Sequence, residues 1–415
     1  MSFYTSLTGL NAAAAELAVA SNNIANSSTT SFKRSDVSFG DIFASSSTSN
    51  TSTAMGGGVS LIGVNQEFSQ GGLELSDNAL DVAITGDGFF PLASSDGGKL
   101  FTRNGGFMLN DDNLVVTTAG HTLQVHPLDV NDVSNFNQAM IPLEVKRSLP
   151  ALPTTTIDLD IRLPEGADVI GADGGTAIDP DDATTYSQAQ TMTLFDDAGD
   201  AYTATIYYQK IGNNVANGAA VEDQWRAAIY VGDDAAASNT IEFNFDQNGD
   251  LTAAIPAPII GASAVAGRSQ TITLNIAAAA RSRPFEIVDQ TQDGKTKGDL
   301  VNINVAENGS VVATYSNGTQ QVAGRINLAT FTSAQGLGQK GNTIYTATGA
   351  SGTLGYGEPG ANGVGTLAGG ATERSNVDIT EELVKLISAQ RNFQSNAKAM
   401  ETTGALTSTL INMRG

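Results

Sequence analysis

The sequence predicts an α+β protein of several domains, with a coiled-coil helix at each end of the chain and mainly antiparallel β-sheet between them. Apolar residues recur every seven residues near both termini, which is typical of a coiled coil. In the middle of the chain apolar and polar residues alternate, and Gly-containing turn sequences separate the alternating stretches. A chain of 415 residues is long enough for roughly two to four domains.

The N-terminal helix is predicted over residues 2–24. Its apolar or small residues are spaced alternately by four and three positions, so that they form one stripe along the helix. The residues of this stripe are Phe3, Leu7, Leu10, Ala14, Leu17, Ser21 and Ile24.

The C-terminal helix is predicted over residues 379–412, with Asp378 as its N-cap and Glu381 three positions later. Residues seven apart again form a stripe, which polar Gln390 and small Gly404 weaken. The stripe consists of Ile379, Leu383, Leu386, Phe393, Ala397 and Met400, and it continues with a change of phase through Leu406, Leu410 and Met413. We call the two stripes together the seam.

Two arrangements are open for these helices: a pair within one chain, or packing against further copies of the chain. Burial of the large seam residues offsets only part of the conformational entropy that two helices of this length lose on ordering. Packing against further copies would also bury the Ala-rich faces, such as the one around Ala12 and Ala15. Self-assembly through both ends is therefore favoured over the intramolecular pair.

The middle of the chain contains half-buried strands, because apolar residues alternate with polar ones over short stretches. The apolar faces are Ile157, Leu159, Ile161 and Leu163; Ile241, Phe243 and Phe245; and Ile272, Leu274 and Ile276. Turn sequences separate the strands, among them DDAGD at 196–200, DQNGD at 246–250, Asn308-Gly309 and Asn317-Gly318. Two low-complexity stretches, 44–58 and 347–371, are predicted to be mobile connectors or extended segments ordered by their neighbours.

Composition excludes several classes of function. The net charge of −22 disfavours nucleic acid as a partner, and the acidic side chains concentrate in 151–284, which holds 18 acidic and 6 basic residues and is predicted to face solvent. No run of 18 apolar residues is present, so no membrane insertion is predicted. The first basic residue is Lys33, which disfavours a Sec-type signal peptide, and the absence of cysteine excludes disulfides.

Motifs for chemistry are weak. The GYGEPG stretch at 355–360 spells GxGxxG but contains a proline and is not followed by a helix, and GLGQKGN at 336–342 lacks the Lys-Ser/Thr of a phosphate-binding loop. The DQNGD stretch faintly resembles a calcium loop, although a hairpin turn explains it better. The histidines His121 and His126 have no evident partner and are predicted to be surface or strand residues. No catalytic, cofactor or metal site is predicted.

Both ends of the chain carry long motifs of a known family. The segment SLTGLNAAAAELAVASNNIANSSTTSFKR at 6–34 resembles the N-terminal motif of bacterial flagellar rod and hook proteins. The segment from Ser375 to Arg414 resembles the C-terminal motif of flagellar hook proteins. Stretches at 64–90, 102–107 and 336–342 agree, whereas 151–284 matches only loosely. The motif residues are Ser21, Asn22, Asn23, Ile24, Ala25, Asn26, Phe32, Lys33, Ser375, Asn376, Val377, Asp378, Gln390, Arg391 and Asn392.

One motif position departs from the family. Ser31 stands before Phe32 and Lys33 where the family usually has glycine. The sequence therefore does not predict the left-handed backbone that glycine allows at this turn. The SNNIAN stretch at 21–26 is expected to end the first helix, with its amides bonded to carbonyls of the helix or of neighbouring backbone.

The resemblance implies a chain that runs outward from the helices and returns. We expect a helical coiled-coil domain (1–30 and 372–415), an extended connector (31–70 and 359–371) and two nested β domains. The inner β domain is discontinuous (71–145 and 285–358), and the acidic outer one is inserted within it (146–284).

The implied function is mechanical: an extracellular subunit of the flagellar hook, a hollow, curved, bendable tube that passes motor torque to the filament. The implied partners are further copies of the chain, the distal rod, the hook cap, the hook-length ruler and the hook–filament junction proteins. Export through the flagellar type III system without a cleaved Sec signal is expected. The alternatives are a distal rod protein of the same axial family, whose relatives generally lack a large inserted domain, and a secreted adhesin or enzyme, for which no motif supplies a site.

Overall fold

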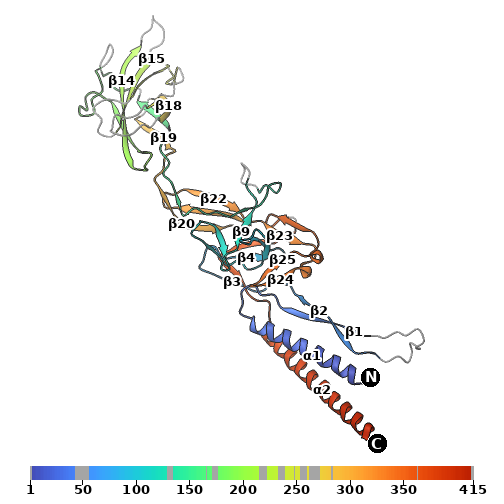
Figure 1. The fold of residues 1–415 in the computed structure, drawn as a ribbon. Helices are drawn as coiled ribbons and strands as arrows, with labels where there is room; N and C mark the ends of the chain where they lie inside the picture. Colours follow the sequence, from blue (N-terminus) through green and yellow to red (C-terminus); the bar gives the residue numbers. More distant parts are fainter. Residues whose placement is uncertain are drawn as a thin grey trace. The chain divides into compact units, whose positions relative to one another are not determined.

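The chain divides into two compact units, which we call the terminal unit and the inserted unit. The terminal unit comprises Met1–Lys146, Val301–Thr314 and Gln320–Gly415, and the inserted unit comprises Arg147–Leu300 and Tyr315–Thr319. The computed structural model (Figure 1) describes residues 2–42, 56–128, 134–164, 166–170, 176–214, 222–231, 239–246, 248–252, 259–260, 272–281, 284–361 and 363–412. Most of the low-complexity stretch at 44–58, and Met413 of the seam, lie outside these residues. The finer division into four domains stays a prediction.

Two helices, α1 (Ser2–Ala25) and α2 (Ile379–Asn412), lie side by side in the terminal unit, as Figure 1 shows. Their limits agree closely with the predicted ones. The carboxylate of Asp378 accepts hydrogen bonds from the backbone N–H groups of Thr380 (2.8 Å) and Glu381 (3.2 Å), so the predicted N-cap is confirmed. The helices therefore form a pair within one chain, and their packing against further copies of the chain stays a prediction.

The β part of the terminal unit contains one large sheet and several two-stranded pairs. The large sheet has eight strands in the order β24-β25-β6-β5-β9-β8-β7, with β10 paired to β9, and its core includes Phe90, Phe101 and Leu123. The smaller pairs are β1-β2, β23-β26, β27-β4 and β28-β3, and β20, β21 and β22 are neighbours, in this order, in a further sheet. Because β26 and β27 fall within 347–371 and β28 begins at its last residue, that Gly-rich stretch is ordered by its neighbours where the structure describes it.

The strands with residues in the terminal unit have the following bounds: β1 Ser35–Asp41, β2 Val59–Gln66, β3 Leu73–Leu75, β4 Val82–Thr85, β5 Phe90–Ala93, β6 Lys99–Thr102, β7 Phe107–Leu109, β8 Val115–Thr117, β9 Thr122–Val125, β10 Ile141–Pro142, β20 Gly298–Val305, β21 Ser310–Tyr315, β22 Gln320–Arg325, β23 Leu328–Phe331, β24 Gly338–Gly341, β25 Ile344–Thr346, β26 Leu354–Gly357, β27 Thr366–Gly369 and β28 Ala371–Glu373. Two short 3₁₀ helices, η1 (Ala334–Gly336) and η2 (Gly349–Ser351), lie between them along the chain. The boundary between the units falls within β20 and β21.

The inserted unit is built from two four-stranded sheets, β17-β18-β12-β19 and β13-β14-β15-β16, which share one apolar core around the fully buried Trp225. Its strands are β11 Ser148–Leu149, β12 Thr156–Pro164, β13 Gln188–Phe195, β14 Ala201–Asn214, β15 Glu222–Val231, β16 Asn239–Phe245, β17 Ile259–Ile260, β18 Ile272–Arg281 and β19 Glu286–Gln292.

The three apolar strand faces predicted for this unit are confirmed, because all their residues belong to the core or pack against it. One pairing departs from the expected antiparallel pattern: β12 and β18 run parallel, with Ile157 opposite Leu274.

The Ser31 backbone is left-handed, with a φ of 56°, although the sequence did not predict this conformation without glycine. Ser31 is fully buried. Its backbone N–H donates to the Glu373 carbonyl (2.7 Å), and its hydroxyl donates to the Arg103 carbonyl (3.1 Å). A left-handed residue other than glycine costs about 1–2 kcal/mol, and these bonds offset that cost.

Substitutions at Ser31 should separate the cost of the left-handed backbone from the contribution of the hydroxyl hydrogen bond. Ser31→Ala keeps the strained backbone and loses the hydroxyl donor, so we expect the free energy of unfolding of the terminal unit to fall by about 1–3 kcal/mol. Ser31→Gly loses the same donor but relieves about 1–2 kcal/mol of strain, so its effect should be smaller. Urea unfolding of both variants measures the difference. Equal losses would show that the backbone at Ser31 is not strained.

Candidate functional site: the terminal helices and their junction

The contact between α1 and α2 uses small residues. A Cβ added at Gly9 would lie 2.8 Å from the Asn396 amide oxygen, so the two backbones approach closely there. Asn23, fourteen residues after Gly9, donates from its side-chain amide to the carboxylate of Glu382, fourteen residues before Asn396 (3.0 Å). The buried Ala13, Ala20 and Ala389 lie on the faces between these two contacts. The helices are therefore antiparallel and meet along a narrow row of small and polar residues.

The large seam residues lie outside this row. Phe3, Ile379 and Leu383 are 50%, 49% and 44% exposed, and Phe393 is exposed as well. Of the other seam residues whose side chains the structure describes, Ser21 and Leu406 are exposed and the rest are only partly buried: Leu7, Leu10, Ala14, Leu17, Ile24, Leu386, Ala397 and Met400. Tyr4, Val384 and Ile387 add to the exposed apolar surface. The structure brings the seam residues of both chain ends onto one helix pair but leaves them without full cover, as at a protein interaction surface.

The sequence missed the small-residue row. Its signal is present, because Gly9, Ala13 and Ala20 recur on one helical face and Ala389 and Asn396 are seven apart. Apolar periodicity favours large residues, so a row of alanine, glycine and asparagine does not stand out.

The Asn-rich motif ends α1, as predicted. The Asn23 amide donates to the Ser35 carbonyl (2.8 Å) and its oxygen accepts from the Ser35 N–H (2.9 Å), so the side chain joins the helix end to β1. Asn26 donates to the Asn22 carbonyl (3.0 Å), one of the carbonyls left open at the helix terminus. Of the other motif residues, Phe32 is buried, Ala25, Gln390, Arg391 and Asn392 are exposed, Val377 is intermediate, and the Ser21 and Ser375 hydroxyls bond to nearby backbone.

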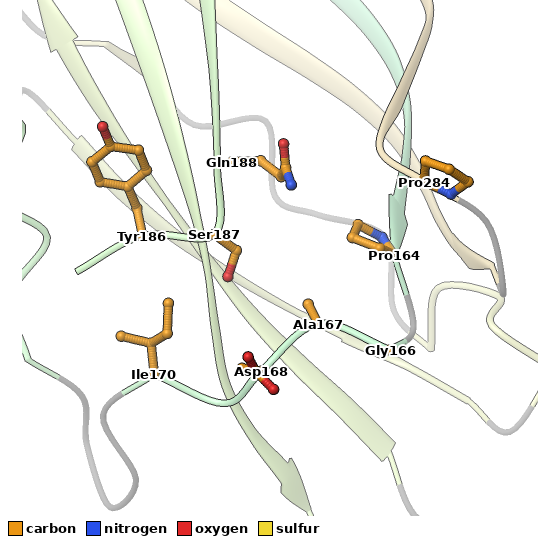
Figure 2. A pocket seen from close by; sticks show the side chains of 9 residues that line it. All are labelled: Pro164, Gly166, Ala167, Asp168, Ile170, Tyr186, Ser187, Gln188 and Pro284. Carbon is orange, nitrogen blue, oxygen red and sulfur yellow. The ribbon is translucent and has the colours of Figure 1, made fainter. Parts of the chain in front are cut away.

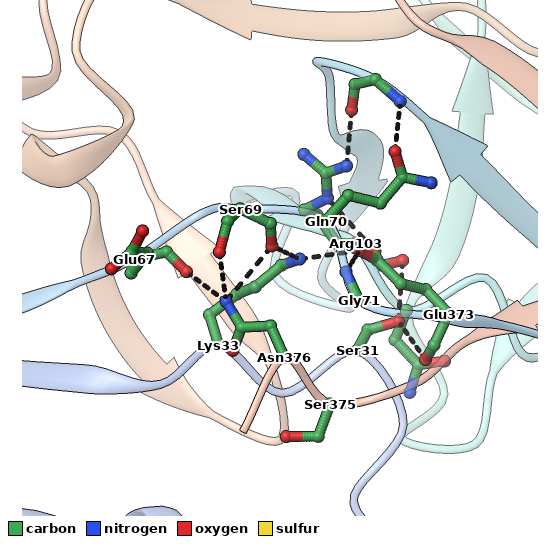
Figure 3. Close-up of polar contacts among 12 residues, drawn as sticks. Ser31, Lys33, Glu67, Ser69, Gln70, Gly71, Arg103, Glu373, Ser375 and Asn376 are labelled. Carbon is green, nitrogen blue, oxygen red and sulfur yellow. Dashed lines mark hydrogen bonds and ion pairs between the residues drawn. The ribbon is translucent and has the colours of Figure 1, made fainter. Parts of the chain in front are cut away.

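A buried group of charged residues lies where the chain leaves and re-enters the β part of the terminal unit (Figure 3). The Lys33 ammonium is 2.7 Å from one carboxylate oxygen of Glu373, and the Arg103 guanidinium is 3.3 Å from the other. Lys33 also donates to the Ser69 carbonyl (2.7 Å) and Arg103 to the Gly86 carbonyl (2.6 Å). The exposed fractions of the Lys33, Glu373 and Arg103 side chains are 0%, 0% and 2%. These partners compensate charges that burial would otherwise make very costly.

Backbone groups complete this group, which we call the junction. The Gly71 N–H donates to the Glu373 carboxylate (2.9 Å). The Asn376 side chain accepts from the Arg34 N–H (2.8 Å) and donates to the Glu67 carbonyl (2.8 Å). The junction thus joins Arg103 and three segments that are far apart in the sequence: 31–34, 67–71 and 371–376.

Burial governs the electrostatics of the junction. Removal from water lowers the pKa of the Lys33 ammonium, the Glu373 carboxylate opposes this effect, and the Arg103 charge adds to it. The sequence singled out Lys33 and Asn376 through the family motifs but missed Glu373 and Arg103. Glu373 is 340 residues from Lys33 and 270 from Arg103, and neither local periodicity nor a motif connects such positions.

The DQNGD stretch and His126 have structural roles. In DQNGD the Asp246 carboxylate accepts from the N–H groups of Asn248 and Asp250, both at 2.9 Å, so the hairpin-turn interpretation is confirmed. His126 is buried rather than at the surface, and its Nδ1 lies 3.2 Å from the Gln138 carbonyl oxygen. Within the described part of the chain no cluster of histidine and carboxylate side chains could hold a metal ion.

A cleft of about 580 Å³ opens on the inserted unit (Figure 2). Among the described residues that line it, Asp168 is the carboxylate, and it lies together with Tyr186, Ser187 and Gln188. Among the described helices, neither is long and apolar enough to cross a membrane.

Comparison with known proteins decides the family. The chain is 34% identical to the flagellar hook protein FlgE of Escherichia coli (strain K12), over 100% of both chains. The chain belongs to the flagellar hook protein family. The hook protein of Salmonella typhimurium is equally similar, at 34% over both full lengths, and that of Borreliella burgdorferi is 28% identical over 100% of this chain and 99% of its own.

Domain models of the family cover most of the chain. They are the flagella basal body rod protein (3–33), the flagellar hook protein FlgE/F/G D1 domain (83–175), the flagellar basal body protein FlaE D2 domain (163–295) and the flagellar basal body rod FlgEFG protein C-terminal (368–413). The crystal structure of Helicobacter pylori flagellar hook protein FlgE2 shares the fold, with a TM-score of 0.51 at 14% identity over 71% of this chain and 98% of that chain.

Membership of the flagellar hook protein family settles the class of function. The chain is a structural subunit of the hook, an extracellular part of the bacterial flagellum, and it is not an enzyme. The expectation of an α+β protein with paired terminal helices and several antiparallel β-sheets is confirmed.

Proposed function

We propose that the chain polymerises through α1 and α2 into a hollow, curved, bendable tube that transmits motor torque to the filament. One observation carries this proposal: the large seam residues, such as Phe3 and Leu383, stay exposed after the two helices have paired. Further copies can cover them, and contacts between different surfaces of successive copies build a helix rather than a closed ring. The inner wall of the tube is then helical, and the acidic inserted unit faces solvent.

The wider set of partners follows from a place in an axial assembly. At the ends of the tube the chain meets the distal rod and the hook–filament junction proteins, and during growth it meets the hook cap and the hook-length ruler. Export uses the flagellar type III system, and because the chain contains no cysteine, no disulfide obstructs its passage as an extended chain. A distal rod protein of the same family is disfavoured by the match of 163–295 to a D2 domain and by hook relatives that match over the full length.

Removal of most of the inserted unit tests where assembly takes place. Leu152 and Lys295 exchange two backbone hydrogen bonds, of 2.9 and 2.7 Å, so a short Gly/Ser link can join them in place of residues 153–294. This cut removes β12 together with both of its partners, β18 and β19, and so leaves no unpaired edge from that sheet.

We expect the shortened chain to be exported and to polymerise, because the exposed seam is intact. Electron microscopy should show tubes that are straighter than those of the full chain or differently curved. A matched control retains the unit and inserts the same link after Gly318, in the exposed Asn-Gly turn of the β21–β22 hairpin. A shortened chain that is folded but stays monomeric would contradict the proposal that assembly depends on the helices.

A further inference from the structure

We propose that Glu373 acts as a clamp that fastens both ends of the chain to the β part of the terminal unit. With the clamp closed, the folded body extends to Ser31 on the outgoing side and to Asn376 on the returning side, whether or not α1 and α2 have found partners.

The first support is the number of segments that meet at one residue. The Glu373 carboxylate accepts from Lys33 of the outgoing segment, from the Gly71 N–H of the connecting segment and from Arg103, which follows β6. The Glu373 carbonyl accepts the Ser31 N–H. β28, which ends at Glu373, pairs with β3, so the clamp is anchored in the sheet itself. No single segment can leave without breaking a bond to this residue.

The second support is burial. Lys33, Glu373 and Arg103 are inaccessible to water, so loss of one partner leaves a charge buried without compensation. The contacts one step nearer the helices differ. Arg34 pairs with Glu67 and Glu381 at 3.0 and 3.1 Å, and both carboxylates are about half exposed, at 46% and 50%. Exposed pairs of this kind contribute little to stability. A step in local stability is therefore expected between the junction and the start of the helices.

The third support is the balance of charge. The junction holds two cations and one anion, so Glu373 alone compensates both Lys33 and Arg103. Replacement of Lys33 leaves a balanced pair, whereas replacement of Glu373 leaves two buried cations. The clamp thus depends most on Glu373. If the chain transmits torque as proposed, the load between the helices and the sheets crosses this residue.

Hydrogen exchange of the unassembled full chain tests the clamp without any need for polymer. The reporters are the amides of Ser31, Arg34 and Gly71, which bond to Glu373 or Asn376. The amide of Val82, which donates to the Gly105 carbonyl, reports on the body of the sheet. In Glu373→Gln we expect protection at the three junction reporters to fall about tenfold or more, with the Val82 amide changed much less.

Glu74→Gln is the matched control, because Glu74 lies on β3 beside the clamp and its pair with Arg374, at 3.8 Å, is about two-thirds exposed. It should leave all four amides unchanged. Lys33→Met provides a second variant that keeps a balanced pair, and it should lower protection at Ser31 and Arg34 while Val82 stays protected. If Glu373→Gln does not fold, Lys33→Met decides the question. Unchanged protection at Ser31, or an equal loss at Ser31 and Val82, would overturn the clamp.

Discussion

We expect a single carboxylate on the apolar seam of α2 to abolish polymerisation while the β-sheets stay folded. Leu386→Asp places an unpaired charge in a surface that successive copies would bury. Such burial costs several kcal/mol, and the cost recurs in every subunit of the tube. No other single substitution should have a larger effect on assembly.

A substitution at Leu383 tests the seam with less disturbance of the monomer. Leu386 is partly buried within the chain, so an aspartate there also disturbs the packing of α2 in the monomer. Leu383 belongs to the same seam but is 44% exposed, so Leu383→Asp changes the outer surface and leaves the contact with α1 intact. Ser388→Asp is the matched control. Ser388 is exposed and lies five residues further on, about 140° around the helix from Leu383.

Sedimentation and electron microscopy of the purified variants measure assembly, and swarming measures hook function. Leu383→Asp and Leu386→Asp should remain monomeric and non-motile, with near-normal urea unfolding of the β-sheets, and Ser388→Asp should assemble. Normal hooks from both leucine variants would show that the seam does not face a packed interface.

Local features of the fold could be predicted from the sequence. Asp378 marks the start of α2 because a cap and the residues it bonds to are adjacent in the chain. The buried face of β12, with Ile157 and Leu163 at its ends, follows from strict alternation, and the Asp246 turn follows from its own residues. In each case the determining interactions span only a few positions.

Features that depend on distant residues could not be predicted. Glu373 meets Lys33 and Arg103 only because β28 pairs with β3 and the chain has returned to its starting point. The same return provides the partners that hold Ser31 in a left-handed conformation without glycine. The parallel pairing of β12 with β18 likewise depends on topology, because each strand alone has the alternation of any half-buried strand.

The helical ends should order fully only on assembly. In the structure α1 and α2 meet through Gly9, Ala13, Ala20 and Ala389, and these small side chains bury little apolar area. Of the large residues that could stabilise the pair, Phe3 and Leu383 are exposed and others, such as Leu386, are only partly buried. A two-helix contact of this kind is marginal in water. We therefore expect far-UV circular dichroism of the monomer to be dominated by β structure, with a gain of helix when the chain polymerises.

Limited proteolysis of the monomer locates the limit of the ordered body. The sequence alone predicts cleavage confined to about 1–70 and 359–415. The clamp narrows this range, because it holds 31–34, 67–71 and 371–376 in the body. Trypsin should cut within α2, at Lys385, Arg391 and Lys398, well before it cuts at the buried Lys33. In Glu373→Gln cleavage at Lys33 should become as fast as cleavage within α2.

The two halves of this prediction can fail separately. If trypsin cuts the unmodified chain at Lys33 as fast as at Lys385, the clamp proposal is refuted, but the prediction that the helical ends are disordered in the monomer still holds. A monomer that resists trypsin at all four sites, with the same helix content as the polymer, would refute ordering on assembly. The contact of Gly9 with Asn396 would then belong to a preformed two-helix stalk. In that case assembly would add contacts between finished stalks, and the exposed Phe3 and Leu383 would still be the residues that meet.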